Sequence, residues 1–208
     1  DLHGMYWSSS NDFTEAMYYR LAQSVSFSNS FIKNASELSG EEVNVFIAEA
    51  RFLRAYAYYN LLDLYGNVPL TTEISTDLPT QSNRTELFNF IESELMEIES
   101  ILLASNEYGR VDNIAAHALL SRLYLNAEAW TGQDRYADCV TYSQNVINSG
   151  YSLNMNDANG NGTAYDELFM ADNDINGAQN EFIFTLNFDG MQSQTYGGTT
   201  FLVHAAIG

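Results

Sequence analysis

Residues 49–70 read EARFLRAYAYYNLLDLYGNVPL, and this stretch decides the fold. In this stretch and in the residues just before it, small and apolar side chains recur at intervals of three and four residues. This spacing predicts a helix with one buried stripe. The stripe comprises Phe46, Ala50, Leu53, Ala57 and Leu61. The helix is expected to end at Gly66, because glycine favours helix ends and Pro69 follows closely. Its start is predicted by the spacing Ser39-x-x-Glu42, which is typical of a capping box.

Helical periodicity extends over residues 1–150. A first helix is expected to begin at Asn11 or Asp12, since either side chain can cap it. Further helices are expected over residues 85–104, 112–127 and 134–148. Asp112 is the expected N-cap of the second of these. The two prolines of the chain lie in one linker, so no breaker interrupts the helices.

A weak internal repeat links two of these helices. Residues 50–60 (ARFLRAYAYYN) and 116–126 (AHALLSRLYLN) place Ala, Leu, Tyr and Asn at the same relative positions. Their offset is close to two tetratricopeptide periods of about 34 residues each. The predicted fold is therefore mainly α, with tetratricopeptide-like helical repeats. A non-repetitive helical bundle is the alternative.

The pattern changes after Gly150. Apolar residues at 182, 184, 186 and 188 alternate with their neighbours, which predicts a strand with one buried face. Residues 199–207 are a second, weaker candidate strand. A small C-terminal β and loop portion is therefore expected to follow the helices.

Charge and composition exclude several classes of function. The 208 residues carry 27 Asp and Glu against 8 Lys and Arg, for a net charge of −19. Nucleic acid and anionic membrane surfaces attract clustered basic residues, so neither is expected as a primary partner. The single cysteine, Cys139, excludes an internal disulfide framework and is expected to be a small buried residue. No apolar run reaches the length of a membrane-spanning helix.

Catalysis has little support in the sequence. The three histidines are scattered, and neither His-Glu-x-x-His nor Gly-x-Ser-x-Gly occurs. His117 lies in an alanine-rich helix, where a structural role is expected. The acidic residues between Glu92 and Glu99 fall mostly off the apolar seam of their helix, so they are expected to form a solvated face. The sequence therefore predicts a protein that is not an enzyme.

Several motifs together resemble the SusD-like (SusD/RagB) family of outer-membrane nutrient-binding lipoproteins. The arginine-bearing stretch at 49–70 is similar to the signature helix of that family. The remaining motifs occur in the same order as in starch-binding members. They are YGR at 108–110 with LYLNA at 123–127, ELFMADND at 167–174, and YGGTT at 196–200.

The resemblance implies a fragment of a larger SusD-like fold. Residues 1–208 would be one piece of a single domain, with helical repeats over 1–150 and a loop and strand region over 151–208 that carries part of a glycan site. The intact protein would be lipid-anchored at the extracellular face of the outer membrane. It would bind starch or maltooligosaccharide and deliver this α-glucan to a TonB-dependent, SusC-like transporter. A tetratricopeptide adaptor that binds a protein segment is the alternative.

Tyr196 is the candidate glycan-binding residue. It follows a turn-prone segment and precedes Gly197-Gly198, which leave room for an uncovered ring. An exposed ring can stack on the apolar face of a pyranose, and the resemblance matches Tyr196 to an aromatic arc that cradles an α-glucan. A turn tyrosine that packs on a sheet is the alternative. Trp7 and Trp130 are expected to pack in the core or at helix ends.

Asp174 is the candidate metal ligand. Asp172-Asn173-Asp174 offers the hard oxygen ligands that calcium prefers, and the resemblance places a calcium ligand at Asp174. A solvated acidic turn is the alternative. The segment Asp157-x-Asn159-x-Asn161-Gly162 is similar to the start of an EF-hand loop, but Leu168 stands where the bidentate glutamate should be, so a loop without metal is expected.

Overall fold

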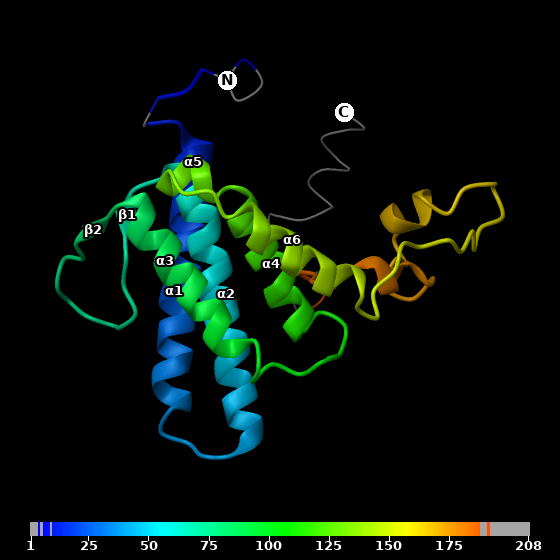
Figure 1. Ribbon diagram of the computed structural model, residues 1–208, viewed down its shortest axis with the longest axis horizontal. Helices are drawn as coiled ribbons and strands as arrows, with labels where there is room; N and C mark the ends of the chain where they lie inside the picture. The colour runs from blue at the N-terminus through cyan, green and yellow to red at the C-terminus, as the bar shows by residue number, and fades with distance from the viewer. Residues whose placement is uncertain (1–3, 5, 9, 188–190, 192–208) are drawn as a thin grey trace. The chain divides into compact units, whose positions relative to one another are not determined.

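Figure 1 shows the computed structural model, which describes residues 4, 6–8, 10–187 and 191. The described helices are α1 (Asp12–Ala35), α2 (Glu41–Tyr65), α3 (Arg84–Ile98), α4 (Asn113–Leu125), α5 (Ala127–Thr131) and α6 (Tyr136–Ile147), with 3₁₀ helices η1 (Asp166–Phe169) and η2 (Ala178–Glu181). Two short strands, β1 (Val68–Pro69) and β2 (Gln81–Ser82), pair antiparallel. The predicted mainly α fold is confirmed.

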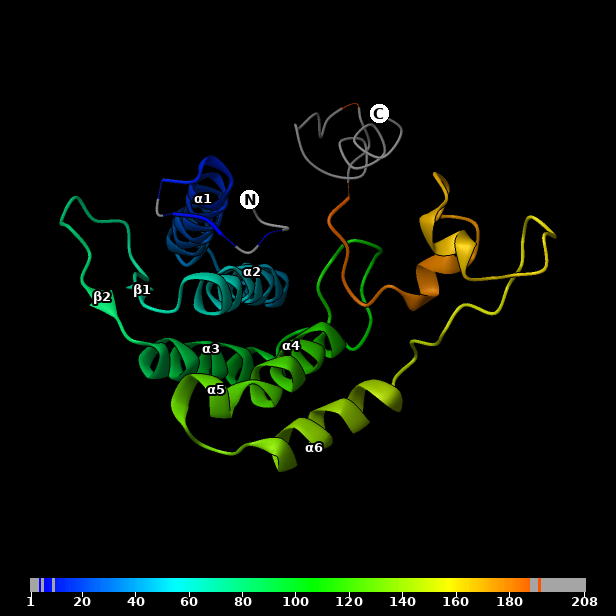
Figure 2. The same ribbon diagram turned by 90° about the horizontal axis from the view of Figure 1, so that it is seen from above.

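The chain divides into two compact units. The first unit comprises residues 1–106 and 111–153 and holds every α-helix and both strands of the described chain. In it, α1 and α2 form a hairpin, α3 packs on α2, and α6 lies along α4 (Figures 1 and 2). The second unit comprises residues 107–110 and 154–208. Its described part contains η1 and η2 joined by loops.

The first two helices begin and end for identifiable reasons. Asn11 caps α1 as expected, because its Oδ1 accepts hydrogen bonds from the backbone N–H groups of Phe13 and Thr14. The predicted capping box of α2 is wrong. The N-cap is Gly40, whose φ of +137° suits glycine, and no side chain caps the helix. At the far end α2 stops at Gly66, as predicted.

Helix α2 is buried more widely than a single stripe. Ala50, Ala57 and Leu61 are buried as expected, but Leu53 is exposed. Tyr58 and Leu62, outside the predicted stripe, are almost completely buried. This follows from the position of α2, which packs against both α1 and α3. Tyr58 of α2 and Tyr124 of α4, which stand at the same position of the expected repeat, are both buried.

The next helices agree with the sequence except at their ends. Helix α3 starts with a capping box that the sequence analysis missed, between Asn83 and Glu86. Its apolar seam is buried as predicted, although the helix ends at Ile98, before residue 104. Asp112 caps α4 as predicted, by accepting a hydrogen bond from the Ala115 N–H. Its other carboxylate oxygen accepts a hydrogen bond from Tyr151 after α6.

The expectation of a solvated acidic face on α3 is wrong for Glu94, whereas Glu97 is exposed as expected. Glu94 is only 6% exposed and binds two arginines of α2. Its Oε2 accepts hydrogen bonds from Nε and Nη2 of Arg54 at 3.0 and 2.5 Å, and its Oε1 accepts from Nε and Nη2 of Arg51 at 3.0 and 2.6 Å. Arg54 also donates from Nη1 to Asn29 of α1 at 2.8 Å. One charge network thus joins three helices.

A second acidic residue of α3 joins the later helices. Glu92 Oε1 accepts hydrogen bonds from the Tyr124 hydroxyl at 2.8 Å and from Arg135 Nη2 at 2.7 Å. The Arg135 guanidinium lies over the Tyr124 ring, 4.5 Å from its centroid. Burial and the Glu92 carboxylate together raise the pKa of Tyr124. Glu92 and Glu94 of α3 therefore bind side chains of neighbouring helices and do not only face water.

The predicted strand at 182–188 is wrong over its described residues, 182–187. They follow η2 in irregular conformation, and residues 182–185 are all half-buried instead of alternating between two faces. Alternation of apolar and polar residues alone is therefore not enough to make a strand here, because strand formation depends on tertiary context. The second candidate strand, at 199–207, lies outside the described residues.

The Glu94 network predicts a large effect on stability. Glu94→Gln leaves the buried Arg54 guanidinium beside a neutral amide, whereas the part-exposed Arg51 keeps Glu97 as a partner. We expect the free energy of unfolding to fall by about 3–5 kcal/mol, because a buried charge has lost its partner. Urea denaturation followed by circular dichroism measures this change.

Glu97→Gln is the matched control. Glu97 binds Arg51 at 2.6 Å, but its side chain is 59% exposed. We expect a loss below about 1 kcal/mol, as for other exposed ion pairs. Equal losses in both variants would show that the buried network does not hold the helices together.

The end of α2 gives a second stability prediction. Gly66 has φ +76° and ψ −87°, which is outside every region favoured by other residues. Gly132, after α5, has φ +74° and ψ +8°, in the ordinary left-handed region. We expect Gly66→Ala to cost about 2–3 kcal/mol and Gly132→Ala about 1 kcal/mol. Thermal unfolding of the two variants checks the difference, and an equal cost would contradict it.

Candidate functional site

The structure describes one of the two candidate site residues, Asp174, but not the other, Tyr196. Tyr196 lies outside the described residues, so its role stays a prediction. Asp174 lies in the turn between η1 and η2 and is exposed. The described part of the second unit nevertheless shows how the chain around Asp174 is built.

The loop that is similar to an EF-hand start is closed by its own aspartate. Asp157 Oδ1 accepts hydrogen bonds from the N–H groups of Gly160 and Asn161 at 2.8 and 3.1 Å. Asp157 Oδ2 accepts from the Gly162 N–H at 2.8 Å. These backbone donors occupy the carboxylate that would otherwise be the first ligand of a metal. The loop is therefore shaped by hydrogen bonds within itself.

A buried glutamate connects this loop to the rest of the unit. Glu167 of η1 is 2% exposed, and its Oε1 accepts a hydrogen bond from the Asn159 N–H at 2.8 Å. Its Oε2 accepts from Nδ2 of Asn176 at 3.0 Å. Glu167 thus holds both the loop and the turn that carries Asp174. No helix-cap or strand pattern predicts this role, because the two partners lie eight and nine residues away in irregular segments.

The described residues do not make a calcium site at Asp174. No group of three or more His, Cys, Asp or Glu side chains that could hold a metal occurs within the described parts of the chain. The neighbouring Asp172 uses its backbone carbonyl to accept from the N–H groups of Ile175 and Asn176. Calcium binds six to eight oxygen atoms, so a site here would need ligands beyond those described. Asp174 as a calcium ligand stays a prediction.

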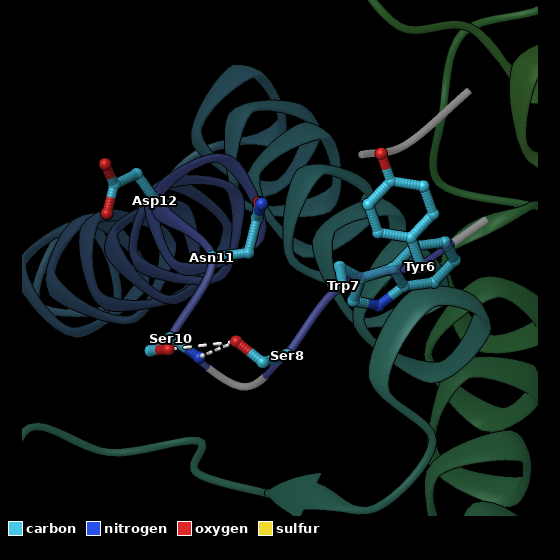
Figure 3. Close-up of a pocket in the computed structure, with 6 residues that line it drawn as sticks. All are labelled: Tyr6, Trp7, Ser8, Ser10, Asn11 and Asp12. Atoms are coloured by element: carbon cyan, nitrogen blue, oxygen red, sulfur yellow. Dashed lines mark hydrogen bonds between the residues drawn. The ribbon is translucent and has the colours of Figure 1, made fainter. Parts of the chain in front are cut away.

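The two tryptophans of the chain have opposite environments. Trp130 of α5 packs edge to face on Tyr59 of α2, with ring centroids 5.8 Å apart, as expected for helix-end packing. Trp7 is 53% exposed, so the expectation that it packs in the core or at a helix end is wrong. It lies in the segment that leads into α1, where it lines an open hollow (Figure 3).

His117 and Cys139 lie among structural contacts in the first unit. His117 Nε2 is 3.5 Å from the Glu99 carboxylate, and its ring packs on Tyr142 at 5.4 Å. Cys139 is half-buried, with Sγ 3.7 Å from the Ser121 hydroxyl, so it is less buried than expected. The contacts of both residues lie within the helical unit.

The family of the chain follows from comparison with known proteins. The SusD-like family, described as starch-binding and associating with the outer membrane, matches residues 5–125. The starch-binding protein SusD of Bacteroides thetaiotaomicron is 40% identical over 200 residues, which cover 95% of this chain and 35% of that protein. The chain therefore belongs to the SusD-like family.

Solved structures agree with this assignment. A SusD-like protein from Bacteroides fragilis has a TM-score of 0.72 at 26% identity, covering 88% of this chain and 35% of its own. A laminarin-binding SusD-like protein has a TM-score of 0.66 at 25% identity, and the match covers 78% of this chain and 36% of that protein. The chain thus spans about a third of the length of these relatives. None of its described helices is long and apolar enough to cross a membrane.

The buried glutamate predicts a local effect in the second unit. Glu167→Ala removes the acceptor of the Asn159 N–H. We expect the exchange of that amide hydrogen to accelerate by about tenfold or more, because a lost charge-assisted hydrogen bond is worth roughly 1.5–3 kcal/mol. Hydrogen exchange followed by nuclear magnetic resonance measures the rate.

Asp174→Asn in calcium-free buffer serves as the control. Its side chain is exposed, so the exchange of the Asn159 amide should remain within about twofold of the parent rate. Unchanged exchange in Glu167→Ala would show that the glutamate does not hold the loop.

Proposed function

We propose that the full-length protein captures a neutral α-glucan, starch or maltooligosaccharide, without catalysis. The observation that carries this proposal is the 40% identity to a starch-binding protein along 95% of the chain. The solved relative that binds laminarin, a different glucan, is only 25% identical. The higher identity favours starch over laminarin as the ligand class of this chain.

The electrostatics of the chain agree with a neutral ligand. Its net charge of −19 repels anions, whereas a sugar without ionised groups neither gains nor loses from that field. Such a ligand binds by ring stacking and by hydrogen bonds from its hydroxyl groups. Affinity then depends on how rigidly the protein holds its aromatic and polar groups.

Binding of glucan without a covalent step agrees with the partners of the buried carboxylates. Glu94 is neutralised by two arginines, and Glu167 accepts hydrogen bonds from amide groups. Asp112 caps α4 and binds the Tyr151 hydroxyl. Glycoside hydrolysis needs one carboxyl group that can donate a proton and a second facing it across the substrate. These three carboxylates instead have structural partners, which supports binding rather than hydrolysis.

The proposal also covers the domain organisation, the location and the partner of the intact protein. Residues 1–208 would form a piece of one SusD-like domain, in which the helical repeats are the platform and residues 151–208 contribute part of the glycan site. The intact protein would be lipid-anchored at the extracellular face of the outer membrane and would pass its glucan to a TonB-dependent, SusC-like transporter. The support is the family description, which associates these proteins with the outer membrane.

A second candidate function is a tetratricopeptide adaptor that binds a protein segment. It is favoured by exposed apolar residues along one face of α1, namely Phe13, Met17, Phe27 and Phe31. An adaptor would retain a peptide partner and show no affinity for glucans. Binding of maltoheptaose by the full-length protein would therefore decide in favour of the first function.

Tyr196 provides the test of the proposed site. Tyr196→Ala in the full-length protein removes a ring expected to stack on glucose. We expect affinity for maltoheptaose to fall by about 1–2 kcal/mol, or roughly 5- to 30-fold, as measured by isothermal titration calorimetry.

Tyr19→Ala is the matched control, because Tyr19 is an exposed tyrosine of α1 at 61% exposure. Its loss should leave the affinity unchanged. The Tyr196 assignment would be wrong if both variants bound maltoheptaose as tightly as the parent protein.

A further inference from the structure

An open hollow lies beside two aromatic rings at the entry to α1. Its volume is about 530 Å³, and it is lined by Tyr6, Trp7, Ser8, Ser10, Asn11 and Asp12 (Figure 3). Tyr6 is 67% exposed and Trp7 is 53% exposed. An exposed tryptophan ring lacks the large favourable free energy that burial would provide. A flat, uncovered indole is also the surface on which the apolar face of a sugar ring stacks.

Polar groups complete the lining of the hollow. Figure 3 shows the two rings together on one side, with Ser8, Ser10 and Asn11 across from them. The Ser8 and Ser10 hydroxyl oxygens are 2.9 Å apart and share one hydrogen bond. Asn11 uses its Oδ1 to cap α1, and its Nδ2, which carries two donors, has no hydrogen-bond partner among the described residues. Hydroxyl and amide groups beside an aromatic face suit a ligand rich in hydroxyl groups.

The charge of the lining restricts the ligand further. Neither arginine nor lysine is among the residues that line the hollow, whereas Asp12 adds a carboxylate at its edge. A phosphate or carboxylate ligand would find no cation there. The volume falls within the range of small-molecule sites. A neutral oligosaccharide segment therefore matches the hollow better than an anion does.

The polar side of the hollow is attached to a rigid element. Asn11 is fixed by its hydrogen bonds to the first turn of α1. That turn is held in place on α2, because the Tyr65 hydroxyl donates to the Thr14 carbonyl and the Tyr65 ring packs edge to face on Tyr18. The part of the hollow formed by Asn11 and Asp12 is therefore held in place before a ligand binds, which reduces the cost of ordering it.

We propose that this hollow is a second glucan-binding site, in which Trp7 stacks on a glucose ring and Ser8, Ser10 and Asn11 bind its hydroxyl groups. The proposal rests on the proposed function, because the ligand is a segment of the same α-glucan. It assigns to the helical first unit a contact with sugar in addition to the contact expected at Tyr196. A protein with two weak sites retains a long polymer better than one site does.

Hydroxyl-radical footprinting with mass spectrometry tests the site on the full-length protein. Trp7 should be oxidised readily in the free protein and several-fold more slowly with saturating maltoheptaose. Phe13 is the internal control, because it is 70% exposed on α1 and does not line the hollow. Its oxidation should not change. Slow oxidation of Trp7 in the free protein, or equal oxidation with and without sugar, would overturn the proposal.

Affinity electrophoresis in starch gels separates this proposal from the proposed function. Tyr196→Ala should keep part of the retardation by starch, and adding Trp7→Ala should remove it, with an affinity loss of about fivefold for Trp7→Ala alone. Phe13→Ala in place of Trp7→Ala should have no effect. If starch retards the parent protein and the Trp7→Ala variant equally, the second site is wrong. If starch does not retard the parent protein at all, the proposed function itself fails.

Discussion

The buried ion pair between Arg54 of α2 and Glu94 of α3 is the constraint on which the helical unit depends. Glu94 also binds Arg51, and Arg54 reaches Asn29 of α1, so one network sets the register of three helices. Apolar side chains of similar volume can stabilise a core as well as a buried ion pair can. The pair adds specificity, because each helix has to present one particular atom to its neighbour. A platform fixed in this way can hold distant ligand-contacting groups in position.

Local features of the helical unit could be predicted from the sequence, whereas the Glu94 network could not. Helix positions, the Asp112 cap and the stop at Gly66 follow from residues a few positions apart, and these predictions are confirmed. The burial of Glu94 depends on an arginine 40 residues away, which no local pattern reveals. An acidic residue is solvated by default, so the sequence predicted an exposed face. The predicted strand at 182–188 is wrong over its described residues for a similar reason, since strand formation depends on tertiary context as well as on local alternation.

The candidate site was less predictable than the fold. Tyr196 and Asp174 were assigned through resemblance to a family, and their roles depend on groups that neither local sequence nor the described structure supplies. Trp7 was expected to be packed, because tryptophan usually buries its large ring. Its exposure depends on how the segment before α1 meets the helix, which is a tertiary property. A glucan bound at Trp7 would make the helical unit a binding surface as well as a support.

The central claim is that the full-length protein binds a neutral α-glucan by stacking and hydrogen bonding. Calorimetric titration with maltoheptaose at about 50 mM and about 500 mM sodium chloride tests it most directly, because salt screens only interactions between charges. We expect binding with the same affinity at both concentrations, despite the net charge of −19 on this chain. No heat of binding, or an affinity that falls steeply with salt, would show that the protein does not bind a neutral glucan in this way.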